Sequence, residues 1–315
     1  MNVKVKSAVY ILLFVFFAIP FNAFEIGFVT PALALFVGLM YALILGDVPY
    51  GKFNKKCSKY LLQAAVVGLG FGMNFEQSIQ AGKDGMLLTI ASVFVVMILA
   101  VFIGKKMKLD DKTSYLIGSG TAICGGSAIA AIGPVIKADD NQMAVSLGTI
   151  FMLNAIALFI FPPIGRMIGL TDAQFGTWAA IAIHDTSSVV GAGQAFSDPA
   201  LEIATLVKLT RALWIIPLAI VTTFVYREKS KKITIPWFIF LFIIAMLVNT
   251  YAGIPEKITG VITDIAKQGM VLTLFLIGSS LSINVVKKVG LTPVILGVVL
   301  WVIIGIVSLG AILLI

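Results

Sequence analysis

The chain has 315 residues, of which 59% are hydrophobic and only 12% are charged, and its mean hydropathy is +1.05. Soluble domains carry about 25% charged residues, so this composition excludes a soluble protein and indicates an integral membrane protein. The apolar runs are about 20 residues long without polar alternation, which predicts membrane-spanning helices and not a barrel. The net charge of +8 does not call for a nucleic-acid partner, because basic loops are expected on the cytoplasmic face of membrane proteins.

Cysteine and histidine usage limits the groups that the chain could bind. The two cysteines, Cys57 and Cys124, and the single histidine, His184, predict neither a disulfide framework nor a metal cluster. The sequence also contains no nucleotide-binding loop. We therefore expect no cofactor and no ATP-driven activity from this chain alone.

Eleven membrane-spanning helices can be drawn along the chain. The first follows Lys4 and Lys6 and resembles a signal peptide, but its cleavage site near Ala23 is weak, so we expect this span to be retained. The expected spans are 7–24, 28–46, 58–76, 85–104, 113–136, 141–165, 173–196, 200–226, 233–252, 262–286 and 290–314.

The distribution of basic residues supports this topology. Most of the 23 lysines and arginines, Lys112 and Arg166 among them, fall on the side of the N-terminus. The opposite side has Lys83, Lys137, Lys257 and Lys267. The positive-inside rule then predicts a cytoplasmic N-terminus and an external C-terminus, with no soluble domain between them. Residues 1–315 thus form one polytopic membrane domain.

Ten of the eleven spans can form two five-helix inverted repeats, 28–165 and 173–314. This scheme matches span five with span ten, and it places Gly278 and Ser279 opposite Gly126 and Ser127. A rival likeness relates residues 124–127 to residues 184–187. Spans five and seven would run in the same direction, so the inverted repeat does not explain that second likeness.

The stretch 120–130 interrupts span five with small and polar residues. Gly125 and Gly126 disfavour a helix interior by about 1 kcal/mol each relative to alanine, and Ser127 is a good N-cap. We expect a broken helix here, which membrane depth tolerates only where protein or a watery cavity covers it. The alternative is a tight helix–helix contact through small residues.

Four spans place polar residues near the middle of the membrane, if helices rise about 1.5 Å per residue through a core about 30 Å thick. Each central lysine or arginine costs roughly 2.5–3.5 kcal/mol, so these side chains should face the bundle interior. One alternative is structural: Asp185 pairs with a cation and holds two spans together, and His184 is a packing residue. The residues concerned are Gly125, Gly126, Ser127, His184, Asp185, Lys208, Arg211, Gly278, Ser279 and Ser280.

Two half-helix N-termini and two cations at one level would favour a small anion as ligand. We expect Arg211 to bind this anion and Lys208 to pair with Asp185, although the reverse assignment also fits the sequence. A proton on His184 would add positive charge beside the anion and couple the two binding events. Sodium is the alternative coupling ion.

Two stretches, 120–131 and 182–192, resemble the signature motifs of the YeiH family (UPF0324) of bacterial inner-membrane proteins, and 68–74 is similar to a third. The resemblance covers nearly the whole chain. Members are commonly labelled sulfate exporters, and the family is similar to bile-acid sodium symporters and sodium/proton antiporters. It implies an all-α fold in which a panel domain lies beside a core domain with two crossed, discontinuous helices. The acidic pair that some of these antiporters carry on span five is replaced here by residues 124–126, which disfavours plain cation exchange.

The leading functional prediction is secondary active transport of a small anion, either sulfate-like or a small organic carboxylate or sulfonate, with alternating access at a midplane site. An anion channel or a membrane sensor is the alternative. An intramembrane hydrolase using Cys124 and His184 is remote, because neighbouring His184 and Asp185 would point about 100° apart on a helix. We therefore expect that the protein is not an enzyme and that it is located in the bacterial inner membrane. A homodimer is one of the oligomeric states that the sequence allows.

Overall fold

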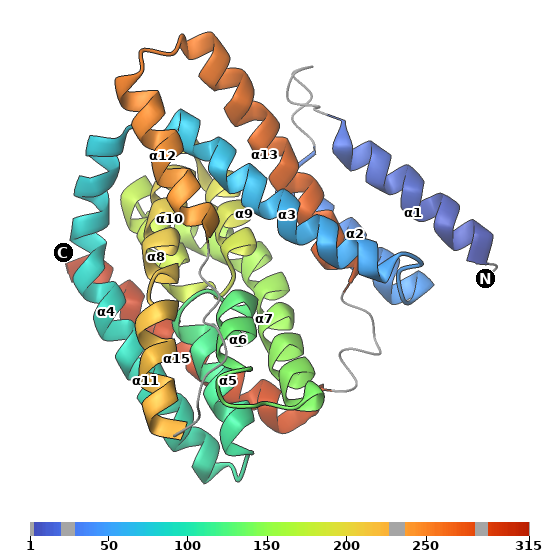
Figure 1. Ribbon diagram of the computed structural model, residues 1–315, viewed down its shortest axis with the longest axis vertical. Coiled ribbons are helices and arrows are strands. Elements are labelled where there is room, and N and C mark those ends of the chain that lie inside the picture. The colour runs from blue at the N-terminus through green and yellow to red at the C-terminus, as the bar shows by residue number, and fades with distance from the viewer. Residues whose placement is uncertain (1–2, 20–28, 227–236, 281–288, 315) are drawn as a thin grey trace.

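The computed structural model describes residues 3–19, 29–226, 237–280 and 289–314, and side-chain positions for all of these except 3 and 77–87 (Figure 1). Within these ranges the chain is all-helical, as predicted. The helices are α1 Val3–Ala18, α2 Pro31–Leu45, α3 Gly51–Leu69, the 3₁₀ turn η2 Gly70–Gly72, α4 Phe75–Lys106, α5 Asp111–Ala122, α6 Gly126–Ile132, α7 Asp140–Met167, α8 Asp172–Ala182, α9 Thr186–Phe196, α10 Asp198–Ala212, α11 Ile215–Tyr226, α12 Trp237–Tyr251, α13 Glu256–Ser279 and α15 Leu291–Leu314.

Five of these segments are long and apolar enough to cross a membrane. They are Leu88–Lys106 in α4, then α7, the α10–α11 pair, α13 and α15. Two shorter apolar helices, α2 and α12, accompany them. The chain is therefore a multi-pass membrane protein.

The helices pack as two groups. The first, which we call the panel group, contains α1, α2, α3, α12 and α13; the second, the core group, contains α4 to α11 and α15. In Figure 1, α1, α2, α3 and α13 run roughly parallel across the upper right of the view. The groups meet where α9 packs against α2 and α13, and where α4 meets α12.

A cavity of about 100 Å³ lies on the boundary between the groups, lined by residues of α3, η2, α10 and α13. One ion pair crosses it, from Lys267 Nζ in α13 to Asp198 Oδ1 in α10, at 2.6 Å. Asp198 and Glu202 are exposed here. Where α4 meets α12, the backbone N–H of Phe75 also donates to the Thr250 hydroxyl at 2.9 Å, and the Tyr251 hydroxyl donates to Glu76 at 3.1 Å.

Within the panel group, α2 and α13 approach each other through glycine. A Cβ on Gly38 would collide with the carbonyl oxygen of Phe275, and one on Gly278 with that of Leu35. Such contacts between small residues let two helix backbones approach closely in a membrane. Gly278 therefore serves helix packing.

The first hairpin, α5–α6, replaces the crossing that we predicted for span five. The Lys112 ammonium donates to the carbonyl oxygen of Lys137 at 2.9 Å, and the Gln142 amide donates to Asp110 at 2.9 Å. Residues 110–112 and 137–142 therefore lie at the same end of the molecule. The chain enters, turns at 123–125 and returns. The predicted break in this segment is therefore found, but the prediction that the broken helix crosses the membrane over 113–136 is wrong.

The second hairpin, α8–α9, replaces the crossing that we predicted for span seven over 173–196. The rings of Phe175 and Phe196 stack with centroids 3.9 Å apart, and the Ser197 hydroxyl donates to Asp172 at 2.5 Å. Both limbs of this hairpin thus begin and end at one end of the molecule. Its tip, residues 183–185, points toward the tip of the first hairpin.

The two hairpins enter from opposite ends because the long helix α7 lies between them. After the second hairpin, α10 and α11 run back, and the ring of Tyr226 at the end of α11 lies 5.3 Å from that of Tyr115 near the base of the first hairpin. Each hairpin is therefore followed by a helix of crossing length, in opposite directions. This explains the likeness between residues 124–127 and 184–187: the two stretches lie at the two hairpin tips.

The break that we predicted at Gly278 and Ser279 in span ten coincides with the end of α13, and the residues that would continue this span are not described. Helix α13 continues through Ser279, and the segment 281–288 lies outside the described ranges. The predicted crossing of spans five and ten is thus replaced, in the described structure, by two hairpins that meet tip to tip.

Candidate functional site

The two hairpin tips touch at Gly125 and Asp185. Gly125 has φ +64° and ψ −126°, a conformation that essentially only glycine adopts. A Cβ on Gly125 would lie 3.1 Å from both Cα and Cβ of Asp185. Glycine at this position therefore allows both the turn of the first hairpin and its contact with the second.

Asp185 shapes the second tip by capping α9. Its backbone is extended, and its carboxylate accepts hydrogen bonds from the backbone N–H of Ser187, at 3.1 Å, and from the Ser187 hydroxyl. The backbone N–H of Asp185 donates in turn to the side-chain oxygen of Asn154 in α7 at 3.0 Å. The unwound backbone is thus tied to a crossing helix.

Arg211 links the two hairpins through backbone carbonyls. Its Nε donates to the carbonyl of Ala122 at 2.5 Å and its Nη1 donates to that of Ile181 at 2.7 Å. Both carbonyls lie in the last turns of α5 and α8, where carbonyl groups have no hydrogen-bond donor within their own helix. One fully buried guanidinium therefore joins the ends of both incoming limbs.

Lys208 lies one turn before Arg211, and its hydrogen bonds go to the second hairpin alone. Its ammonium donates to the carbonyls of Ile183 at 2.7 Å and Ala180 at 3.2 Å. A helix C-terminus carries roughly half a negative charge, so both cations stabilise the helix ends that they contact. Both side chains are fully buried, which confirms the prediction that this face of α10 looks into the bundle.

Several polar atoms at the tips have no hydrogen-bond partner in the described structure. They are Nη2 of Arg211, Nδ2 of Asn154, Oγ1 of Thr121 and both ring nitrogens of His184. The His184 ring is fully buried, with its centroid 6.3 Å from that of the Trp301 ring in α15. Unpaired buried polar groups are costly, so this concentration is typical of a functional site.

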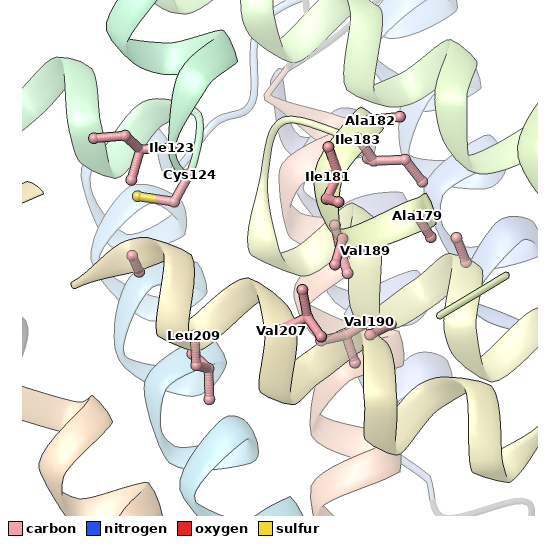
Figure 2. Close-up of a cluster of buried hydrophobic side chains, with 14 of the residues drawn as sticks. Ile123, Cys124, Ala179, Ile181, Ala182, Ile183, Val189, Val190, Val207 and Leu209 are labelled. Carbon is pink, nitrogen blue, oxygen red and sulfur yellow. The ribbon is translucent and has the colours of Figure 1, made fainter. Parts of the chain in front are cut away.

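Apolar side chains enclose the polar tips. Figure 2 shows Ile123 and Cys124 of the first tip, the second hairpin with Ile181 and Val189, and α10 with Val207 and Leu209. Cys124 is 1% exposed. The tips are therefore occluded from water where these apolar side chains cover them.

The structure brings most of the predicted site residues together. Gly125, His184, Asp185, Lys208 and Arg211 meet at the tips, whereas Gly126 is half-buried and Ser127 is exposed at the start of α6. The expected ion pair of Asp185 with Lys208 is not formed, because each takes a different partner among the described residues.

Gly278, Ser279 and Ser280 lie elsewhere, in the panel group. The side-chain amide of Asn54 in α3 donates to the Ser280 hydroxyl at 2.7 Å and to the Ser279 hydroxyl at 3.2 Å. It also donates to the Leu276 carbonyl at 2.8 Å, and it accepts from the Tyr10 hydroxyl at 2.6 Å. These contacts close the end of α13 and place its serines against α3.

The predicted site residues did not include Asn154, Asn54 or Trp301. Asn154 was visible as a polar residue in an apolar run. Nothing in the sequence, however, indicated that its partner is the unwound backbone of another segment.

Comparison with known proteins identifies the family. The model of the family described as "Conserved hypothetical protein 698" matches residues 8–297. A UPF0324 membrane protein of Bacteroides thetaiotaomicron is 58% identical over 90% of this chain and 86% of its own length. Similar proteins from Porphyromonas gingivalis and Vibrio parahaemolyticus are 53% and 46% identical, over 92% and 90% of this chain and 88% and 93% of their own lengths. No solved structure matches the chain. The chain therefore belongs to the UPF0324 family of membrane proteins.

Proposed function

We propose that the protein is a secondary transporter of a small anion, with its binding site at the hairpin tips. The observation that carries this proposal is Arg211, which bridges both tips and whose Nη2 has no partner among the described residues. The charged groups at the tips are the cations Lys208 and Arg211 and the carboxylate of Asp185. The tips therefore carry an excess positive charge when His184 is neutral. An anion would pair with this charge and satisfy the free donors.

The anion would approach along the start of α6. Ser127 is exposed there while the cations behind it are buried, so its hydroxyl and the adjoining backbone are the accessible part of the site. We infer a sulfate-like anion or a small carboxylate or sulfonate, because a forked guanidinium recognises such oxyanions well.

Alternating access would come from movement of the core group relative to the panel group. The boundary between them carries a cavity and a single ion pair among the described residues, which suits a surface that slides. A proton on His184 is the proposed coupling charge and sodium the alternative. We assign no catalytic role to Cys124, His184 or Asp185, and we propose the bacterial inner membrane as the location.

Thermal unfolding of the detergent-solubilised protein against a panel of oxyanions tests this function. A specific anion at about 100 times its dissociation constant adds about 2.7 kcal/mol to the free energy of unfolding. We expect one such anion to raise the melting temperature and to be taken up by proteoliposomes. Ser127→Leu should remove both effects while the ligand-free melting temperature stays unchanged, because the exposed side chain can be enlarged without repacking the core.

Ala130→Leu is the matched control, since Ala130 is also exposed and lies one turn further along α6. It should bind and transport like the wild type. If Ser127→Leu also does so, the anion site is misplaced. Repeating the titration with His184→Gln across about pH 5 to 8 tests the proton, and an unchanged pH dependence would exclude His184 as the coupling group. Unitary currents in a bilayer would instead identify a channel.

A further inference from the structure

The first half of α3 carries a continuous basic stripe. Lys52, Lys55, Lys56 and Lys59 are spaced three, four and seven residues apart, so they lie on one face of the helix, and all four are exposed. No carboxylate occurs anywhere in α3, and the nearest acidic residue before it in sequence is Asp47. The stripe is thus a concentrated positive surface on a single helix.

Aromatic side chains form a second stripe directly beside the lysines. Tyr50, Phe53 and Tyr60 are 44%, 55% and 56% exposed, and the Lys59 ammonium lies 5.9 Å from the centre of the Tyr60 ring. Aromatic rings prefer the headgroup level of a bilayer, where one end is apolar and the other is wet. Lysine and aromatic stripes together are typical of a helix that lies at the membrane interface.

The third face of the same turns is anchored inside the protein. Asn54 is fully buried and binds the end of α13, while Ala65 and Val66 further along α3 are also buried. The four lysines form no ion pair among the described residues. Tyr50 packs against Tyr10 and Phe53 against Phe14 of α1, with ring centroids 6.2 Å apart in each pair, yet both rings stay largely exposed. The common orientation of the lysines and rings toward the outside calls for a partner that is negatively charged and partly apolar.

We propose that this stripe is a binding site for the headgroups of anionic phospholipids in the surrounding bilayer. Four ammonium groups would contact the phosphates of neighbouring headgroups, and Phe53 and Tyr60 would lie among the acyl ends below them. Clusters of four to eight basic residues at the end of a membrane helix attract anionic lipids in this way. This site is separate from the hairpin tips, and it does not depend on the proposed transport function.

Titration of the detergent-solubilised protein with phosphatidylglycerol, followed by native mass spectrometry, tests the proposal. Each lysine near an anionic surface contributes roughly fivefold in affinity, so replacing all four lysines of α3 by glutamine should weaken binding at least about tenfold. Phosphatidylcholine, which carries a phosphate but no net charge, should bind the wild type and this variant equally. Inorganic phosphate should not displace the bound phosphatidylglycerol.

A matched control replaces by glutamine four lysines from the end of α4 to the start of α5, namely Lys105, Lys106, Lys108 and Lys112. It changes the net charge by the same amount, yet the carboxylates of Asp110 and Asp111 lie between Lys108 and Lys112 in the sequence. This control should retain phosphatidylglycerol with wild-type affinity. An equal loss in both quadruple variants would overturn the assignment to α3, as would displacement by inorganic phosphate. Should the α3 variant fail to fold, Phe53→Ser with Tyr60→Ser keeps the charge and should still weaken binding; unchanged binding would then contradict the proposal.

Discussion

Gly125→Ala should disrupt the contact between the two hairpin tips. A non-glycine residue at positive φ costs of order 1–3 kcal/mol, and overpacking at a tight contact costs a similar amount. The new methyl group would press on the backbone of Asp185, which cannot move without disturbing the cap of α9. We expect a large drop in the melting temperature of the detergent-solubilised protein and no anion uptake.

Gly126→Ala is the control for this prediction because it adds the same methyl group one residue away. Its φ is not positive, and its Cβ would meet only the ring edge of Phe151 and the end of Leu147. These side chains can shift, so the melting temperature should change little. Equal destabilisation by both substitutions would show that the turn has no special requirement at Gly125.

Arg211→Met should be the most damaging change on α10. It would leave the buried carbonyls of Ala122 and Ile181 without partners, at about 1–3 kcal/mol for each. The partial negative charges at the ends of α5 and α8 would also lose their counterion. We expect the melting temperature to fall sharply and anion binding to disappear. Arg211→Lys should have an intermediate effect, because a single ammonium group cannot bridge both hairpins as the forked guanidinium does.

Arg166→Met provides the comparison. Arg166 also donates to two carbonyls at a helix end, those of Ala195 at 2.7 Å and Phe196 at 3.1 Å, but it is exposed. Water can replace the lost hydrogen bonds there, so this substitution should cost under about 1 kcal/mol. A similar loss at Arg166 and Arg211 would argue against a special role for the buried guanidinium.

The sequence predicted which residues belong to the site better than it predicted how the chain reaches them. Arg211, Lys208, His184 and Asp185 stood out because charged and polar groups are costly in an apolar span. Hydrophobicity cannot distinguish a span from a hairpin of similar length, since both are apolar throughout. The partners of the cations were also hidden, because backbone carbonyls have no sequence signal.

The positive-inside rule could not detect the error. Replacing two crossings by two hairpins leaves the side of every other loop unchanged, and only Lys137 and Arg166 exchange sides. The number of cations on each face is therefore the same in both topologies. The likeness between residues 124–127 and 184–187 was the signal that pointed to the hairpins, and it conflicted with the assumption that spans five and seven cross the membrane.

Gly278 shows a second limit of sequence reasoning. Glycine followed by serine suggested a break in span ten, yet the same pair provides close packing of α13 on α2. Small residues in a membrane helix serve both purposes. Only the position of the neighbouring helix, set by Gly38, distinguishes them.

The central claim, that two hairpins enter from opposite sides and meet at their tips, is tested most directly by cysteine labelling. Lys112→Cys, Lys137→Cys and Arg166→Cys would each be introduced singly into a chain in which Cys57 and Cys124 are replaced by serine and alanine. A membrane-impermeant maleimide would then be applied to intact cells and to inverted vesicles. The hairpin structure predicts that positions 112 and 137 are labelled from one side and position 166 from the other. Labelling of positions 112 and 137 from opposite sides would contradict it and restore a crossing over 113–136.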